Sequence, residues 1–412
     1  MRLGVPEIRE RAERFDSALE EETYRTRAGL KTRPEFRALF NADAVLAGPD
    51  LIPSIERRLA EAEGEDERCL RMLLEWAAGF HMRSAIARLD DEYWAWEASS
   101  ALERDGRALP LRQMARSVAS ESERAVRLES EVGRNEMLEE LIPMQIDRVA
   151  RARDAMADLG YGSFVEAKER LCGFSVRNLA ADLRRFMDET RDAYFDLHTY
   201  HLKRYLDISA AEAEVTDRRW LSRMSWLDEY FDRPRVIDRA HQDLREMGLL
   251  TEDGHGIERD FEARPLKRAG SFCATIEIPD RVVICLAPTG GRPDCVSYMR
   301  ELGLALHAVH TDPDLIYEYR ALGDASVSQA FGILFYRLMQ NRTWLERVTG
   351  LEGDALEEYL LLARFLDLCR QRRNAAILSY ELIVLGSSHT SDLADTYVEL
   401  LLEATGFRHD PR

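Results

Sequence analysis

The sequence predicts a mainly α-helical protein with one small β element in its C-terminal half. Apolar residues recur at helical spacing through most of the 412 residues, a pattern typical of helices that bury one face. A clear example is the stripe Leu70, Leu73, Leu74, Ala77 and Ala78. Segment 271–287 differs, because two short runs rich in β-branched residues, SFCATIEIP and RVVICLA, flank a Pro-Asp turn. That arrangement predicts a β-hairpin.

Further segments are expected to form helices in chain order. Segments 144–159 and 179–205 lack internal Pro and Gly and mix charges of both signs, which favours helices with one polar face. After the hairpin, Asp294 is expected to cap a helix over 294–310. Two later helices are expected over 324–340 and 355–373, the second followed by the apolar run 375–385.

Composition and charge argue against several classes of protein, although a local basic patch stays possible because net charge does not give the distribution of charge. Apolar residues make up 45% of the chain and charged residues 32%, which is typical of a globular protein. The formal charge of -18 argues against a nucleic-acid partner, since such a protein needs a basic face to neutralise phosphates. No run approaches 18 uninterrupted apolar residues, so no membrane-spanning helix is expected.

The cysteines and the start of the chain bear on the compartment. The first residues are charged and show no apolar signal region. Six cysteines occur without any C-x-x-C pair, which favours buried free thiols in a reducing environment. A cytoplasmic protein is therefore expected. The cysteines are Cys69, Cys172, Cys273, Cys285, Cys295 and Cys369.

A degenerate metal motif lies in the helix after the hairpin, which reads YMRELGLALH over 298–307. In an H-E-x-x-H helix, two histidines four residues apart bind zinc, and the glutamate between them polarises the attacking water. Here the two histidine positions hold Arg300 and Leu304, and only Glu301 remains.

The run R-E-L-G-L-A-L-H resembles the H-E-x-G-H-A-x-H motif of the thimet oligopeptidase and oligoendopeptidase F family of zinc metallopeptidases. The flanking segments 264–273, 288–291 and 322–331 resemble the same family. The likeness extends over nearly the whole chain and is strongest over 260–338. The family's third zinc ligand is a glutamate 25 residues after the second histidine. Counted from Leu304, that position is Gln329.

The resemblance implies a two-lobed helical, zincin-like oligopeptidase fold with a deep cleft and a small sheet on one wall. We expect an N-terminal helical lobe over 1–160 and a catalytic-like lobe over 161–412, with the hairpin at 271–287 and the degenerate motif helix at 294–310. The residues expected to line the cleft are Cys273, Ile276, Ile278, His307, His310 and Tyr336.

The same resemblance also predicts a loss of zinc chemistry, because three ligand positions are changed together. Catalytic zinc takes three N, S or O donors from the protein, whereas leucine offers none and a guanidinium is a permanent cation. No metal and no cofactor are therefore expected, and Glu301 is expected to have no bound water to activate. We expect Arg300 to pair instead with Glu301 or with another carboxylate. The family also supplies carbonyl-stabilising groups beyond the stretch that 404–406 matches, and these are not expected here.

Three functions remain open at this point. The first is a pseudopeptidase, not an enzyme, that binds extended peptides or a protein partner. The second is an enzyme of other chemistry, with Glu301 as general acid or base and Arg300 orienting an anionic substrate. The third is a peptidase with an unorthodox metal site.

Individual residues also carry alternatives. Arg300 and Glu301 could be an ordinary surface pair. His307 with His310, and His198 with His201, have the spacing of metal pairs but lack an obvious third donor. A further group could line the cleft or could cap and pair helices: Glu318, Arg320 and Asp324. The hairpin edge over 273–278 could pair with a peptide or could be covered by the rest of the chain.

Overall fold

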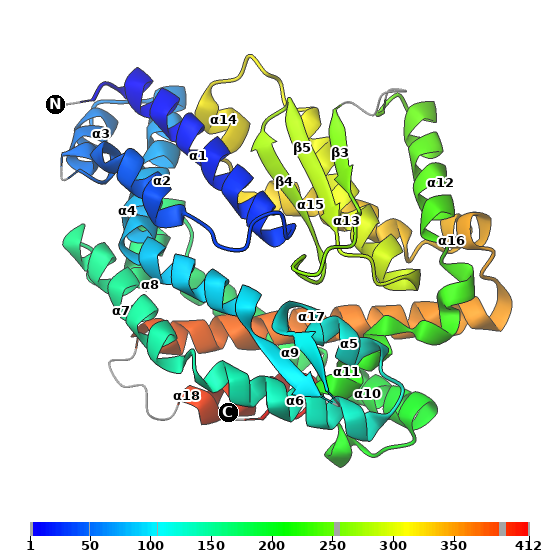
Figure 1. Ribbon diagram of the computed structural model, residues 1–412. Helices are drawn as coiled ribbons and strands as arrows, with labels where there is room; N and C mark the ends of the chain where they lie inside the picture. The colour runs from blue at the N-terminus through cyan, green and yellow to red at the C-terminus, as the bar shows by residue number, and fades with distance from the viewer. Residues whose placement is uncertain (1–2, 49, 105, 251–255, 387–392, 411–412) are drawn as a thin grey trace.

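The computed structural model describes residues 3–48, 50–104, 106–250, 256–386 and 393–410, and within these ranges it is mainly helical (Figure 1). The helices are α1 (Val5–Arg27), α2 (Phe36–Ala42), α3 (Leu51–Leu59), α4 (Gly64–Ser99), α5 (Leu111–Ser120), α6 (Arg124–Glu139), α7 (Ile142–Asp158), α8 (Phe164–Cys172), α9 (Val176–Glu189), α10 (Arg191–Leu206), α11 (Val215–Arg223), α12 (Arg233–Glu246), α13 (Gly291–Val309), α14 (Tyr317–Ala321), α15 (Ala325–Leu338), α16 (Arg342–Thr349), α17 (Gly353–Gly386) and α18 (Leu393–Thr405). The strands are β1 (Ala101–Arg104), β2 (Arg107–Pro110), β3 (Ile257–Asp260), β4 (Ser271–Glu277) and β5 (Arg281–Leu286). The predicted fold class is confirmed.

The expected helices form, with two differences. The segment 179–205 is divided at Thr190, which separates α9 from α10. The helix expected from Asp294 begins three residues earlier, at Gly291, because the left-handed Gly290 (φ 87°) turns the chain there. Asp294 then lies in the first turn, where its carboxylate accepts a hydrogen bond from the Thr289 N–H at 2.8 Å.

The hairpin forms as predicted and belongs to a three-stranded sheet. β4 and β5 pair antiparallel, with Ser271 opposite Leu286. β3 joins the other side of β5 in parallel, so the strand order is β3-β5-β4 and β4 is an outer strand. The sequence analysis did not anticipate β3, nor the separate β1–β2 hairpin, because these four-residue strands carry too few apolar side chains to stand out.

The sheet lies between two helices. On one face, Ala274 of β4 and Val283 of β5 pack against Tyr24 of α1 and against Ala28, the residue that follows this helix. The opposite face enters the largest apolar core, which also contains side chains of α13 and extends to α17. Figure 1 shows α1 alongside β4, with α13 beyond the sheet. The motif helix is therefore held directly against the strands that would line a cleft.

Polar anchors join α1 to the sheet. Tyr24 donates a hydrogen bond to Asp260 at 3.3 Å, across 236 residues of sequence. The Lys267 ammonium donates to the same carboxylate at 2.8 Å in a buried ion pair. Arg264 donates to Asp260 at 2.8 Å and to the Ala28 carbonyl at 3.0 Å. Because every partner is satisfied, these buried charges fix the position of the first helix.

Two further expectations concern cores and cysteines. A second apolar core gathers residues of α1 to α4, from Val5 to Ala87, while the largest core runs from Tyr194 to Phe407; the lobe boundary at 160 stays a prediction. All six cysteines are free thiols, and Cys69, Cys285, Cys295 and Cys369 are buried. Within the described ranges, no helix is both long and apolar enough to cross a membrane.

Candidate functional site

The site rests on a close crossing of α13 and α15. A Cβ placed on Gly303 would lie 2.3 Å from the carbonyl oxygen of Phe331 and 3.0 Å from the Cα of Gly332. The two helices therefore touch backbone to backbone, which a larger residue at 303 would prevent. The crossing places Arg300 and Leu304 of α13 opposite Gln329 of α15.

A hydrogen-bonded network joins the three polar residues of the degenerate motif. Arg300 Nη1 donates to Glu301 Oε1 at 3.0 Å, and Nη2 donates to the side-chain oxygen of Gln329. The expected pairing of Arg300 with Glu301 is thus confirmed. It is not an ordinary surface pair, since the Glu301 side chain is 2% exposed while that of Arg300 is 38% exposed.

Glu301 is also tied to the sheet. Ser271, the first residue of β4, donates its hydroxyl to Glu301 Oε1 at 3.0 Å. Among the described residues, Glu301 Oε2 is buried without a hydrogen-bond partner. A buried carboxylate needs a cation and hydrogen bonds to offset the loss of water, and Arg300 with Ser271 supplies both to one of its two oxygens.

Other buried charges surround this carboxylate. Burial raises the pKa of the Cys273 thiol, and the negative charges of Glu301 and Glu20 raise it further. The Arg27 guanidinium stacks on the Phe272 ring at 4.0 Å. Burial, with the neighbouring Arg268, lowers the pKa of Arg27. Because its pKa is raised, the Cys273 thiol stays protonated at neutral pH and is not a nucleophile.

These residues do not fit the zinc ion that the family motif implies. Leu304 presents hydrocarbon, and the one amide oxygen of Gln329 is engaged by Arg300. A fixed guanidinium beside the site would repel a dication. Over the part of the chain that the structure describes, no group of three or more His, Cys, Asp or Glu side chains is arranged to hold a metal ion.

A groove opens beside the network. One cavity of about 390 Å³ lies between β4 and the two crossing helices. Its lining includes Cys273, Thr275, Ile278, Leu304, His307, Val327, Ser328 and Gln329. A second cavity of about 630 Å³ adjoins it along α1 and shares Thr275, Ile278, Arg320 and Ala321. The two together follow the outer edge of β4.

The outer edge of β4 is not paired with another strand in the described residues. One of its donors already has a side-chain partner, since the backbone N–H of Thr275 faces the Glu20 carboxylate of α1. Burial raises the pKa of Glu20, while Arg27 and this N–H oppose the rise. Glu20 thus occupies one hydrogen-bonding position on the outer edge of β4, and no described strand pairs with this edge.

The structure brings together only some of the predicted cleft residues. Cys273, Ile278 and His307 line the first cavity, where His307 Nδ1 lies 3.2 Å from the Ser328 hydroxyl. Ile276 points to the α1 face of the sheet and lines only the second cavity.

Two of the expected cleft residues lie elsewhere. His310 Nδ1 bonds its own helix at Leu306 O, 2.9 Å away, and His310 does not line either cavity. Tyr336 is buried under α17, where its hydroxyl donates to Asp367 at 2.5 Å. The expectation that Tyr336 lines the cleft is therefore corrected. Its side chain is buried against α17 because Asp367 provides an acceptor for its hydroxyl there.

The second histidine pair does not form a metal site either. His198 and His201 lie in an aromatic cluster with Phe365. No ring nitrogen of this pair has a hydrogen-bond partner in the described residues. Burial lowers the pKa of both imidazoles to about 4.

The residues before α15 combine both of the roles weighed for them. Asp324 caps α15 by accepting from the Ser326 N–H at 2.8 Å. Glu318 is fully buried and pairs with Arg9 at 2.7 Å, and Arg320 pairs with Glu13. Arg320 and Asp324 also line the groove. These ion pairs hold α14 against α1, and α1 lines the second cavity of the groove.

Sequence reasoning missed the contribution of α1. Glu20 and Arg27 approach the site from the first helix, more than 240 residues before the motif. Ser271 was included only as part of a strand. No local pattern marks these residues, because their role depends on how α1 packs against β4.

Comparison with known proteins supports the fold. No family model and no curated protein matches the sequence. Among solved structures, PZ peptidase A with an inhibitor is similar with a TM-score of 0.64 and 13% identity, over 96% of this chain and 69% of that one. An oligoendopeptidase F structure from Bacillus anthracis strain Ames has a TM-score of 0.64 and 14% identity, over 95% and 70%. Another oligoendopeptidase F structure has a TM-score of 0.61 and 14% identity, over 94% and 68%.

Proposed function

We propose that this chain is a non-hydrolysing relative of the oligopeptidases whose fold it shares, and that it binds extended peptides in the groove beside β4. The observation that carries the proposal is the network in which Arg300 bonds both Glu301 and Gln329. At the positions that match the family's metal ligands, this chain has a cation, two hydrogen bonds and the Leu304 side chain.

The network explains why the fold would survive without hydrolysis. Removing a dication from a buried site leaves a carboxylate such as Glu301 without a counter-charge. Arg300 provides one without any exogenous ion. Ser271 and Arg300 then engage one oxygen of Glu301, and there is no metal-bound water for the carboxylate to deprotonate.

Peptide binding does not need the metal. An extended peptide adds to a sheet edge through backbone hydrogen bonds, and pockets beside the edge select its side chains. The outer edge of β4 borders the groove, which offers about 390 Å³ on the α15 side and about 630 Å³ on the α1 side. Five carboxylates and three arginines line the larger cavity: Glu13, Asp16, Glu20, Glu277 and Asp280, with Arg14, Arg83 and Arg320. We therefore expect a preference for peptides of net positive charge.

The test combines metal content, cleavage and binding. Purified protein is analysed for metals and incubated with a panel of fluorogenic peptides, with and without chelator. Binding of the same peptides is followed by fluorescence anisotropy and by thermal unfolding. We expect no chelator-sensitive cleavage, and peptide-dependent stabilisation that is greater for basic peptides. Stoichiometric zinc with chelator-sensitive cleavage would overturn the proposal.

A pair of variants localises the binding. Val327 and Ile333 are exposed apolar residues of the same helix, and of these two only Val327 lines the groove. Val327→Trp narrows the cavity and is expected to weaken peptide binding. Ile333→Trp is the matched control and is expected to leave it unchanged. Equal affinity in both variants would move the peptide site elsewhere.

A second candidate function is supported by the free oxygen of Glu301. Glu301 Oε2 is buried without a partner among the described residues, and Arg300 is partly open to the solvent. A small anionic substrate held by Arg300 could exchange a proton with this oxygen. Glu301→Gln discriminates the two candidates, since it abolishes turnover of such a substrate but leaves peptide affinity unchanged.

A further inference from the structure

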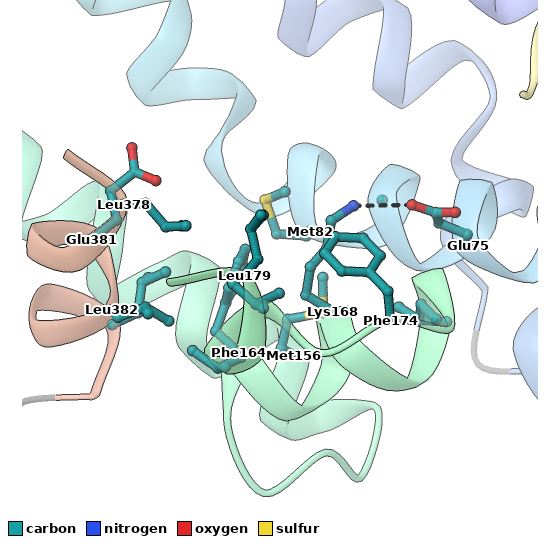
Figure 2. A pocket seen from close by; sticks show the side chains of 15 residues that line it. Glu75, Met82, Met156, Phe164, Lys168, Phe174, Leu179, Leu378, Glu381 and Leu382 are labelled. Atoms are coloured by element: carbon teal, nitrogen blue, oxygen red, sulfur yellow. Dashed lines mark hydrogen bonds and ion pairs between the residues drawn. The ribbon is translucent and has the colours of Figure 1, made fainter. Parts of the chain in front are cut away.

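A separate apolar pocket of about 360 Å³ lies among α4, α8, α9 and α17, with none of its residues in the groove beside β4 (Figure 2). Its size and apolar lining are those of a small-molecule site. The apolar lining residues are Met82, Met156, Phe164, Val165, Leu171, Phe174, Val176, Leu179, Leu378, Leu382 and Leu385.

Helical spacing builds the pocket. α8 presents Phe164, Lys168 and Leu171, and α17 presents Leu378, Leu382 and Leu385, in each case at i, i+4 and i+7. Such residues share one face of a helix. The facing stripes therefore converge on a common space instead of filling it.

A glycine in the wall keeps the pocket open. Gly79 lies in the interior of α4, where glycine is the poorest helix former after proline. A Cβ placed there would meet no atom within 4 Å, so packing does not require the glycine. Met82 and Met156 add flexible side chains to the same wall, and methionine adapts readily to ligands of varied shape.

The charged groups at the pocket are predominantly acidic. At one side, Lys168 is paired with Glu75 at 2.9 Å, and the Cys172 thiol donates to the same carboxylate at 3.0 Å. Asp324 adds negative charge nearby. On the opposite side of the apolar side chains, Glu381 is exposed and has no ion pair among the described residues (Figure 2).

We propose that this pocket binds a small amphipathic cation, with its apolar body between α8 and α17 and its ammonium group at Glu381. Among the described lining residues, Lys168 is the one lysine, and Glu75 already neutralises it, so an anionic head would gain no free cation from them and would face Glu381. A cationic head instead supplies Glu381 with its missing counter-charge. Binding of the apolar body removes the hydrocarbon surface of both the ligand and the pocket from water.

The test compares two probes that differ only in their head group. Decylamine and decanoate, each below the concentration at which it self-associates, are titrated into the full chain by calorimetry and by thermal unfolding. We expect saturable binding of one decylamine per chain and a rise in Tm. Decanoate is expected to bind about two- to five-fold more weakly, as a single partly exposed charge contact predicts.

Three variants locate the site and its charge. Gly79→Leu fills the pocket and is expected to abolish binding of decylamine, with Leu382→Trp as a second filling variant if the first does not fold. Glu381→Gln is expected to remove the preference for decylamine while apolar binding persists. Glu399→Gln, an exposed carboxylate of α18 outside the pocket, is the matched control and leaves the preference intact.

Three results would overturn the proposal. These are tighter binding of decanoate, an unchanged preference in Glu381→Gln, and non-saturable binding that survives both filling variants. None of them bears on the peptide groove, whose ligands are tested separately through Val327→Trp.

Discussion

The Arg300 guanidinium donates to the Gln329 side chain across the crossing of α13 and α15, so a single cation links the two helices. The same guanidinium holds the buried Glu301 at 3.0 Å. The same side chain therefore links the two helices and neutralises Glu301.

The first prediction concerns this network. Arg300→Ala leaves the Glu301 carboxylate buried without its cation, and we expect a loss of about 1–3 kcal/mol in unfolding free energy. A double-mutant cycle with Glu301→Ala should show clear coupling, measured by chemical denaturation. The exposed pair Arg71 and Glu67 serves as the control, with coupling of about 0.5 kcal/mol or less. Zero coupling between residues 300 and 301 would contradict the pairing.

The second prediction concerns zinc. Residues 300, 304 and 329 converge across the helix crossing. The triple variant Arg300→His/Leu304→His/Gln329→Glu should therefore bind about one zinc per chain. Elemental analysis and a zinc-dependent rise in Tm are the measurements. Each single variant lacks two donors and should remain metal-free after dialysis. Failure of the folded triple variant to retain zinc would show that the three positions do not share a site.

The third prediction compares two glycines in helices. Gly303→Ala forces a Cβ against the Phe331 carbonyl at 2.3 Å and should cost about 2–3 kcal/mol of stability. Gly79→Ala meets no atom within 4 Å and should stabilise by about 0.5–1 kcal/mol. Thermal and urea unfolding measure both. Equal effects would mean that the helices separate easily at Gly303.

The fourth prediction concerns acid stability. The pKa of His198 and of His201 falls from 6.5 in the unfolded chain to about 4 in the folded one. Above pH 6.5 both states are neutral, so these groups have no effect. As the pH falls from 6.5 to 4, only the unfolded state takes up protons, and stability is lost by about 2–3 kcal/mol per histidine.

The measurement is the unfolding free energy at pH 7 and at pH 4.5. His198→Leu/His201→Leu should flatten its pH dependence over this range. An equally steep pH dependence in the double variant would assign the acid sensitivity to other groups.

Much of the fold was predictable because its signals are local. Helix α13 and the hairpin of β4 and β5 follow from patterns within short segments, whereas the position of Gln329 was implied by the resemblance to the zinc oligopeptidases. The break at Thr190 did not follow, since the helical pattern continues on both sides of it. Strand β3 was missed because only pairing with β5 identifies Ile257–Asp260 as a strand.

The site was predictable only along its own helices. The resemblance to the family motif indicated Arg300, Leu304 and Gln329, whereas nothing in the sequence indicated Glu20, because it reaches Thr275 only after α1 packs on the sheet. Tyr336 lies seven residues after Gln329 on α15, a spacing that suggests the same helix face. Its hydroxyl nevertheless donates to Asp367 of α17, outside the groove. Periodicity gives the face of a helix but not the element that covers it.

The packing of the first helix against the sheet has a consequence for the order in which the protein folds during synthesis on the ribosome. Tyr24 meets Asp260 only after 236 further residues have been made, so the end of the first helix around Tyr24 and Ala28 stays uncovered while most of the protein is synthesised, although the start of that helix can already pack against α2 to α4. The hairpin of β4 and β5 can close as soon as it emerges. The groove therefore acquires its second wall late, when the beginning of the chain finally docks.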